Sequence, residues 1–81
     1  MNELEQIAIG LAIRKLRLDA KKTLKESAER CNNTKNWLVN IESGRRSLSF
    51  PDAKTLCEFY NSDVRTLSEL TDVFLSNLQG K

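Results

Sequence analysis

The chain has 81 residues, of which 40% are hydrophobic and 30% are charged, which allows one small domain and is ordinary for a soluble globular protein. No apolar run is long enough to cross a bilayer, and the polar, acidic start of the chain is unlike a secretory signal. These features argue against a membrane or secreted protein, and we expect a single cytoplasmic domain over residues 1–81.

Positive charge is concentrated in one part of the chain. Between Arg14 and Arg46 there are ten Lys or Arg residues against four Asp or Glu residues, whereas the whole chain has a net charge of only +2. This asymmetry is typical of a surface that faces phosphate groups. The alternative is an ordinary solvated set of charged helix faces.

The residue types needed for catalysis or metal binding are scarce. Cys31 and Cys57 fall at helical positions that we expect to be buried, and the chain has no histidine. A zinc site needs about four ligands and thiol catalysis usually needs a base, so we interpret both cysteines as small core residues in a reducing compartment. No glycine-rich phosphate loop is present either. We therefore predict that the protein is not an enzyme and has no metal and no cofactor.

The first predicted helix covers about residues 4–20. Its apolar residues recur three or four positions apart, as in a helix with one core-facing stripe, and include Leu4, Ile9, Ile13 and Leu16. Gly10 lies inside this helix, where glycine lowers helix stability. We therefore expect another element to pack closely at that position.

Two short helices are predicted within residues 23–42, joined by a turn at Cys31–Asn33. Thr23 and Glu26 have the spacing of a capping box, and Thr34 is a suitable N-cap for the second of the two helices. Two short helices joined by a tight turn can carry a reading helix into a DNA groove. We therefore predict a helix-turn-helix unit in this part of the chain.

Two more helices complete an all-α domain. Ser49 is the expected N-cap of the fourth helix and Asp63 that of the last, at about residues 64–78. Apolar residues occur on more than one face of the last helix, which suggests burial by a partner; the alternative is a helix folded back onto its own core. The predicted dimer interface consists of Leu70, Phe74, Leu75 and Leu78.

This pattern resembles the lambda-repressor-like helix-turn-helix family, the Cro/repressor or XRE-type regulators. The resemblance covers about residues 9–70 and rests on the spacing of IRKLR at 13–17, TLKESA at 23–28 and LCEFYNSDVRTLSEL at 56–70. It implies a compact five-helix DNA-binding domain, here with an extended C-terminal helix. It also implies an ion pair between Arg17 and Glu42, which would tie the first helix to the third.

The resemblance further implies which residues contact DNA. The third helix would enter the major groove, with base contacts from Thr34, Lys35, Asn36 and Asn40. Their chemistry is suitable, since lysine donates to guanine and asparagine pairs with adenine. Contacts to the DNA backbone are implied at Thr23, Lys25, Arg45 and Arg46, and we add Trp37 at the flank of the reading face. The alternative for Trp37 is a place in the core.

Two departures from the family pattern affect the second helix. Leu24 stands where the family often has a glutamine that contacts the DNA backbone, so that contact is lost. Ser27 replaces a common core leucine, and we expect Leu24 to compensate for it.

We interpret the protein as a sequence-specific DNA-binding transcriptional regulator of repressor or controller type. It would bind palindromic operator DNA as a homodimer, because one small domain reads too few base pairs alone. Its partners would be double-stranded DNA and a second copy, with no membrane. The alternative is an antitoxin or adaptor-type module whose main partner is another protein, a toxin or a second regulator. A steep loss of affinity with salt would distinguish DNA binding from that alternative.

Overall fold

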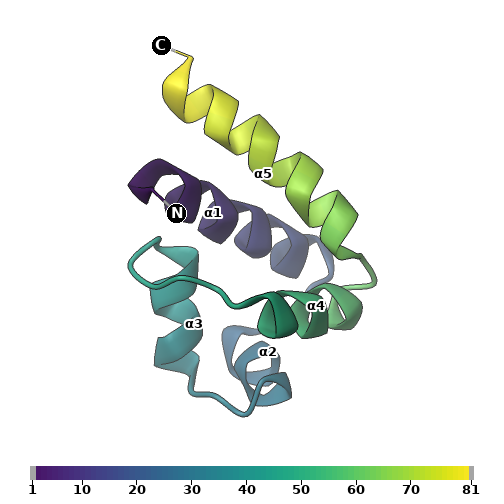
Figure 1. Cartoon of the computed structure of the whole chain (residues 1–81). Coiled ribbons are helices and arrows are strands. Elements are labelled where there is room, and N and C mark those ends of the chain that lie inside the picture. Colours follow the sequence, from purple (N-terminus) through teal and green to yellow (C-terminus); the bar gives the residue numbers. More distant parts are fainter. Residues whose placement is uncertain (1, 81) are drawn as a thin grey trace.

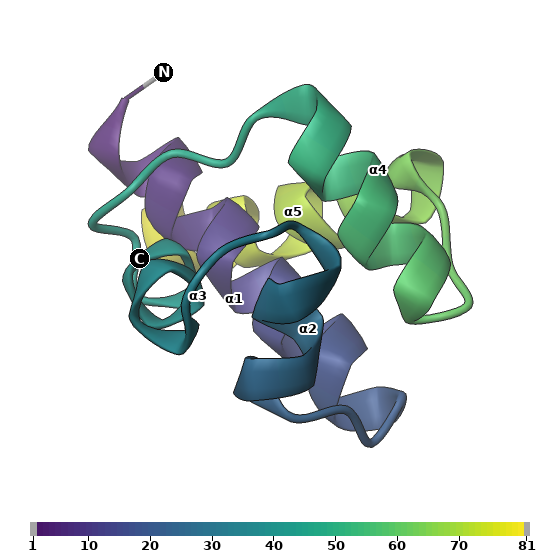
Figure 2. The same cartoon turned by 90° about the horizontal axis from the view of Figure 1, so that it is seen from below.

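The structure, a computed structural model, describes residues 2–80. It contains the helices α1 (Glu3–Asp19), α2 (Leu24–Arg30), α3 (Lys35–Glu42), α4 (Phe50–Phe59) and α5 (Val64–Gln79). No strand occurs within the described residues, so the predicted all-α fold of five helices is confirmed. In Figure 1, α5 lies on one side of α1, and α2, α3 and α4 lie on the other. Figure 2 shows these three helices in front of α1 and α5.

Every helix begins at a side chain that caps it. The caps are Asn2, Thr23, Thr34, Ser49 and Asp63, and each accepts a hydrogen bond from the backbone amide three residues later. Such a bond satisfies one of the amides that have no partner within the helix. The four caps expected from the sequence at α2 to α5 are therefore in place.

Three helices end in the same way, with one residue in the left-handed region. These residues are Lys21 (φ 59°), Asn32 (φ 54°) and Asn61 (φ 58°). In each case the amide of the next residue donates to a carbonyl five positions earlier, as Lys22 does to Arg17 over 3.0 Å. This arrangement closes the last turn of the helix. Asparagine tolerates the left-handed region better than lysine does.

The core lies where α1, α3, α4 and the first half of α5 meet. Its fully buried large side chains include Ile13, Leu38, Ile41 and Leu56. Cys57 is also fully buried and Cys31 is half-buried, and both thiols are free. Burial raises the pKa of each thiol to about 11, so both stay protonated at neutral pH. This position fits the interpretation of the two cysteines as core residues.

No helix within residues 2–80 is both long enough and apolar enough to span a bilayer. In the same residues, no group of three His, Cys, Asp or Glu side chains is arranged to hold a metal ion.

The packing of α5 corrects part of the predicted dimer interface. This helix makes its most extensive contacts with α1 of the same chain. Leu70 and Phe74 are half-buried against the chain's own core, because the stripe that carries them faces α1. For these two residues the structure shows the alternative, a helix folded back onto its own domain. Leu75 is half-buried and Leu78 is 40% exposed.

The contact between α1 and α3 determines where α3 lies, and it depends on Gly10. A Cβ atom at this position would clash with the carbonyl oxygen of Ile41 and would lie 2.7 Å from that of Glu42. Only glycine therefore lets the backbones of the two helices approach this closely. This is the close packing that the glycine inside the first helix indicated.

A second contact holds the end of α3 against the start of α1. Gly44, just after α3, has φ +82°, and a Cβ atom there would lie 2.6 Å from the Ile7 side chain. Gln6 donates a hydrogen bond from its Nε2 to the Gly44 carbonyl oxygen over 2.9 Å. Both contacts therefore hold the C-terminal end of α3 against α1.

We predict that Gly10→Ala destabilises the protein by about 1–3 kcal/mol, as overpacking of a tight contact does. In an open helix the same change would stabilise by up to about 1 kcal/mol. The free energy of unfolding in urea distinguishes the two outcomes. A gain in stability would mean that α3 does not approach α1 as described.

We predict that Lys21→Gly stabilises the protein, in contrast to Gly10→Ala. Glycine removes the left-handed strain of the lysine, which is roughly 1–2 kcal/mol. Glycine also gives the unfolded chain more conformational entropy, which offsets part of this gain. The net gain in the free energy of unfolding is therefore about 0.5–1 kcal/mol. Thermal unfolding measures the change. Asn32→Gly is the matched control and should gain less, because asparagine already tolerates the conformation. An equal gain at both positions would contradict this explanation.

Candidate nucleic-acid interface

A bidentate ion pair joins the end of α3 to α1. Arg17 donates from Nε to Glu42 Oε2 over 2.7 Å and from Nη2 to Glu42 Oε1 over 3.0 Å. The two side chains are only 10% and 8% exposed. The hydrogen bond to Glu42 raises the pKa of Arg17 above its ordinary value. This is the pair that the family resemblance implied, and its two parallel bonds restrict the orientation of both side chains.

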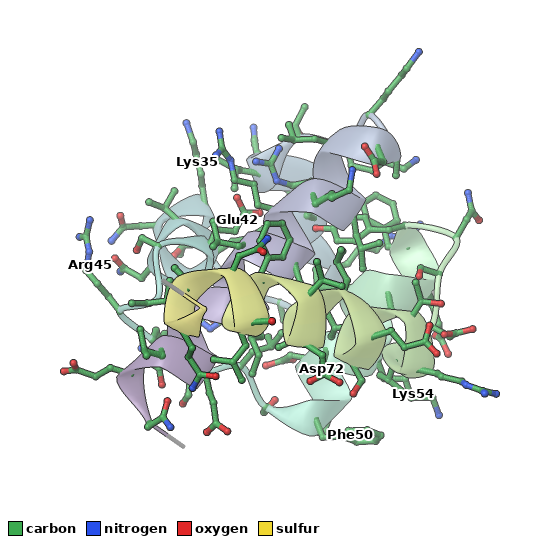
Figure 3. The ribbon with its side chains drawn as sticks, turned by 90° about the horizontal axis from the view of Figure 1, so that it is seen from above. Lys35, Glu42, Arg45, Phe50, Lys54 and Asp72 are labelled. Carbon is green, nitrogen blue, oxygen red and sulfur yellow. The ribbon has the colours of Figure 1, made fainter. Side chains whose placement is uncertain are left out.

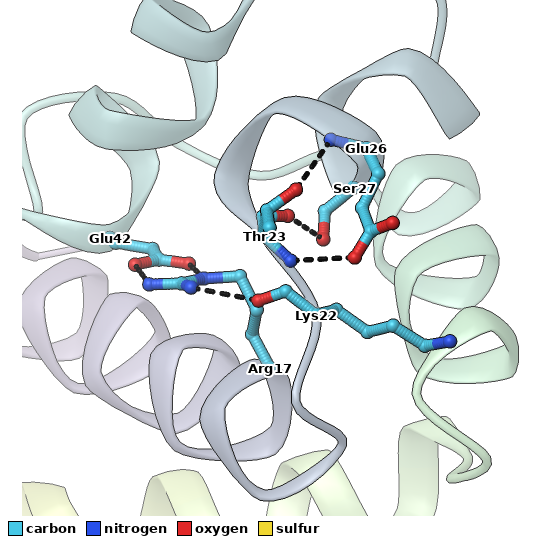
Figure 4. A network of polar contacts seen from close by, with 6 residues as sticks. All are labelled: Arg17, Lys22, Thr23, Glu26, Ser27 and Glu42. Carbon is cyan, nitrogen blue, oxygen red and sulfur yellow. Dashed lines mark hydrogen bonds and ion pairs between the residues drawn. The ribbon is translucent and has the colours of Figure 1, made fainter.

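The same guanidinium group also holds the segment before α2. Arg17 donates from Nη1 to the carbonyl oxygen of Lys22 over 3.0 Å. The next residue, Thr23, forms the capping box of α2 with Glu26, as Figure 4 shows. One side chain of α1 therefore connects the start of α2 with the end of α3. The two helices of the helix-turn-helix unit are held at a common point.

Ser27 is fully buried within α2, where the family commonly has leucine. Its hydroxyl donates to the carbonyl oxygen of Thr23 over 2.7 Å. The buried polar group is therefore satisfied within its own helix. Leu24 is half-buried and packs against the core, which is the compensation that we expected.

The predicted base-contacting residues lie together at the start of α3 and one turn further on. Thr34, Lys35 and Asn36 are exposed, and Asn40 is half-buried. The Thr34 oxygen accepts the amide of Trp37 over 3.2 Å, so its hydroxyl proton is free to donate to a ligand. In Figure 3 the Lys35 side chain points away from the body of the protein. The structure thus presents donors and acceptors on one exposed end of a helix.

The predicted backbone contacts Arg45 and Arg46 lie in the loop that follows α3. Both are exposed, and none of the ion pairs within residues 2–80 involves them. Their backbone amides donate to the Asn40 carbonyl oxygen over 2.9 and 3.2 Å. The Ser43 hydroxyl donates to the same oxygen over 3.1 Å. The loop is therefore fastened to α3 at the residue whose side chain is predicted to read a base.

Two further predicted backbone contacts lie at the start of α2. Lys25 is exposed and free of any ion pair within the described chain. Thr23 is exposed too, but its amide already donates to Glu26 Oε1 over 2.8 Å. Lys25 is therefore better placed than Thr23 to meet a phosphate group.

The prediction that Trp37 contacts the DNA backbone is not what the structure shows. Trp37 is only 9% exposed and belongs to the core cluster. It neighbours Leu38 on α3 and precedes Ile41 by one turn, so all three lie on the buried side of the helix. Removal of an indole from water is strongly favourable. The core alternative is therefore correct for this side chain.

Sequence reasoning missed a cluster of two cations on one aromatic ring. Lys22 Nζ lies 4.7 Å and Arg30 Cζ lies 4.5 Å from the centre of the Phe59 ring. Such cation–π contacts join the ends of α2 to α4. Two charges of the basic segment are thus engaged within the protein, and no spacing rule in the sequence connects them with a residue of α4.

Comparisons with known proteins identify the same arrangement. The family model of a helix-turn-helix domain matches residues 8–70. A crystal structure of the clp gene regulator ClgR from Corynebacterium glutamicum is similar, with a TM-score of 0.87 and 25% identity, covering 95% of this chain and 81% of that chain. A second ClgR structure has a TM-score of 0.82 and 25% identity, covering 88% and 91% of the two chains. No curated protein sequence matches. Because the family match extends over most of the sequence, the chain belongs to the helix-turn-helix domain family.

Proposed function

We propose that this helix-turn-helix protein is a sequence-specific transcriptional regulator that binds palindromic operator DNA as a homodimer. One observation carries the proposal. The polar side chains at the start of α3 are exposed, whereas the opposite side of the same helix is anchored in the core by Leu38 and Ile41. The likeness to ClgR, which is described as a gene regulator, supports the same function.

In this proposal α3 lies in the major groove with its first turn against the base edges. Lys35 donates to guanine O6 or N7, and Asn36 and Asn40 pair with adenine. These two asparagines are four residues apart, so they lie on one face of the helix. Thr34 contributes its free hydroxyl proton. A helix N-terminus also favours the negative charge of nearby phosphate groups.

Phosphate contacts set the position of α3 in the groove. Arg45 and Arg46 flank one end of the reading helix and Lys25 lies on the first turn of α2. Contacts of this kind orient a protein on the duplex without reading its sequence. The hydrogen bonds from the loop to Asn40 give the arginines a defined place relative to the base-reading side chains.

The direct test is selection of binding sites from random duplex DNA at two salt concentrations. Enrichment of a palindrome, with affinity that falls steeply as salt rises, is the expected result. Binding that shows no preferred sequence would contradict base reading. Absence of DNA binding at both concentrations would favour the alternative, an antitoxin or adaptor-type module whose partner is another protein.

We predict that Asn36→Ala and Asn40→Ala each weaken binding to the selected palindrome by about 1–3 kcal/mol for each half-site. The loss should be confined to sequences with the preferred base, since each variant removes one base contact from each half-site. Titration of matched and mismatched duplexes measures both quantities. Asn77→Ala, at an exposed position on α5, is the control and should bind like the wild type. Equal losses on every sequence would exclude base readout by these residues.

We predict a different signature for Arg45→Ala. Loss of a phosphate contact should weaken binding to all duplexes alike and reduce the slope of log affinity against log salt by about one for each half-site, hence by about two for the homodimer. The matched control is Lys54→Ala, because Lys54 lies on the side of the molecule opposite Lys35 in Figure 3. An unchanged slope for Arg45→Ala would remove this arginine from the phosphate contacts.

A further inference from the structure

A hollow lies on the side of the molecule where the second half of the reading helix meets α1. It has a volume of about 320 Å³ and lies between α1, the start of α2 and the end of α3. Its lining consists of Arg14, Arg17, Leu24, Val39, Glu42 and Ser43. Lys25 directly follows the lining residue on α2, and Arg45 lies two residues beyond the last one. The hollow therefore separates two sets of proposed phosphate contacts.

The hollow contains one charge that the described chain leaves without a partner. Arg17 and Glu42 form the buried bidentate ion pair, so their charges compensate each other (Figure 4). Arg14 is exposed and takes part in none of the ion pairs within residues 2–80. The rest of the lining is neutral. The hollow is thus net positive through Arg14 alone.

The carboxylates that share a hollow with Arg14 are already paired. Arg14 also borders a second hollow, between α1 and α5, which contains Asp19. The Asp19 carboxylate is paired with Lys15 over 3.2 Å, as that of Glu42 is with Arg17. Arg14 is therefore available to an anion from outside the chain. Its planar guanidinium group suits two oxygens of one phosphate group.

Ser43 supplies a second donor at the same hollow. It is exposed, and its hydroxyl donates to the Asn40 carbonyl oxygen over 3.1 Å. That oxygen also accepts hydrogen bonds from the amides of Arg45 and Arg46, and a carbonyl oxygen has only two lone pairs. The hydroxyl can therefore turn toward a ligand while the Asn40 oxygen remains satisfied.

The apolar part of the lining strengthens a contact with a backbone phosphate. Leu24 and Val39 are half-buried and both line the hollow. Apolar walls lower the local dielectric constant, so that opposite charges beside them attract each other more strongly than in open water. Sugar carbons flank each phosphate of a nucleic acid, and they can pack against the same two side chains.

We propose that this hollow binds one DNA phosphate of each half-site, held by the guanidinium group of Arg14 and the hydroxyl group of Ser43. The inference rests on the proposed function, and it adds a contact from α1 to those from α2 and from the loop after α3. A DNA strand that runs between Lys25 and Arg45 would pass over the hollow. Because Arg17 on the same helix already holds α3, the contact would tie the duplex to the helix that orients the reading helix. It would set position without reading sequence.

The salt dependence of DNA binding tests the role of Arg14. Arg14→Ala should reduce the slope of log affinity against log salt by about one for each half-site, hence by about two for the homodimer. Arg14→Lys should keep the slope but bind more weakly, because lysine keeps the charge and lacks the planar fork. An unchanged slope for Arg14→Ala would overturn the proposal.

Arg65→Ala is the matched control and should keep both the slope and the affinity of the wild type. Arg65 is exposed, and it lines a groove on α5 together with Asp72. In Figure 3, Asp72 lies on the side of the molecule opposite Lys35. A slope that falls as much for Arg65→Ala as for Arg14→Ala would overturn the proposal, because the effect would then be one of net charge.

Uncharged phosphates in the DNA locate the contact. Each phosphate of one half-site in the selected palindrome is replaced in turn by a methylphosphonate, and the affinity of each duplex is measured. One replacement should weaken wild-type binding by about tenfold or more, as loss of a hydrogen bond to a charged group does. The same replacement should have no effect on Arg14→Ala and a reduced effect on Ser43→Ala, but should still weaken binding by Arg45→Ala. If no replacement loses its effect in Arg14→Ala alone of the two arginine variants, the proposal is wrong.

These outcomes are distinct from failure of the proposed function. All of the substituted side chains are exposed, and circular dichroism melting confirms that each variant folds. A wild-type chain that selects a palindrome, together with an Arg14→Ala variant that keeps the full salt slope, would overturn this phosphate contact alone. A wild-type chain that binds no DNA would overturn the contact and the proposed function together.

Discussion

The placement of α3 depends on the direct approach of its backbone to that of α1. The absence of a side chain at Gly10 permits this approach, and the hydrogen bond from Gln6 and the ion pair of Arg17 then fix the end of α3 in two places. Packing turns the one apolar face of α3, which carries Trp37, Leu38 and Ile41, toward the core. The bidentate pair with Glu42 then fixes the end of the helix against α1, since two parallel hydrogen bonds are satisfied in one orientation only. Desolvation of the two charges makes a buried ion pair a weak source of stability. The contribution of this pair is therefore to the orientation of α3 relative to α1.

Helix α3 divides its residues between two tasks. Trp37, Leu38 and Ile41 face the core, and the polar residues of its first turn face outward. The basic segment of the chain is divided as well. Arg17 is used in the ion pair, Lys22 and Arg30 lie on the Phe59 ring, and Lys25, Arg45 and Arg46 remain exposed. The net positive charge of this segment therefore overstates the number of cations available to a nucleic acid, and only the structure shows which ones are free.

Much of this arrangement could be predicted from the sequence, and the failures have physical causes. Helix starts were predictable because capping depends on residues three positions apart, as at Thr23 and Thr34. The Arg17–Glu42 pair came from the family resemblance, because no local rule connects residues 25 positions apart. Trp37 was misplaced because a residue at the flank of a short helix can face either water or the core, and periodicity does not tell which. For Leu70 and Phe74, an apolar stripe indicates burial but not whether the same chain or another one covers it. The contact of Lys22 and Arg30 with Phe59 had no signal in the sequence.

The loop after α3 is attached through main-chain atoms. The amides of Arg45 and Arg46 and the hydroxyl of Ser43 all meet the carbonyl oxygen of Asn40, and none of these bonds uses the asparagine side chain. Residue 40 could therefore be exchanged for another amino acid while the loop keeps its place. Descendants of such a protein could acquire a new target sequence by single substitutions, without first rebuilding the part that grips the duplex. Base recognition and contact with the DNA backbone can therefore change independently, although both depend on residue 40.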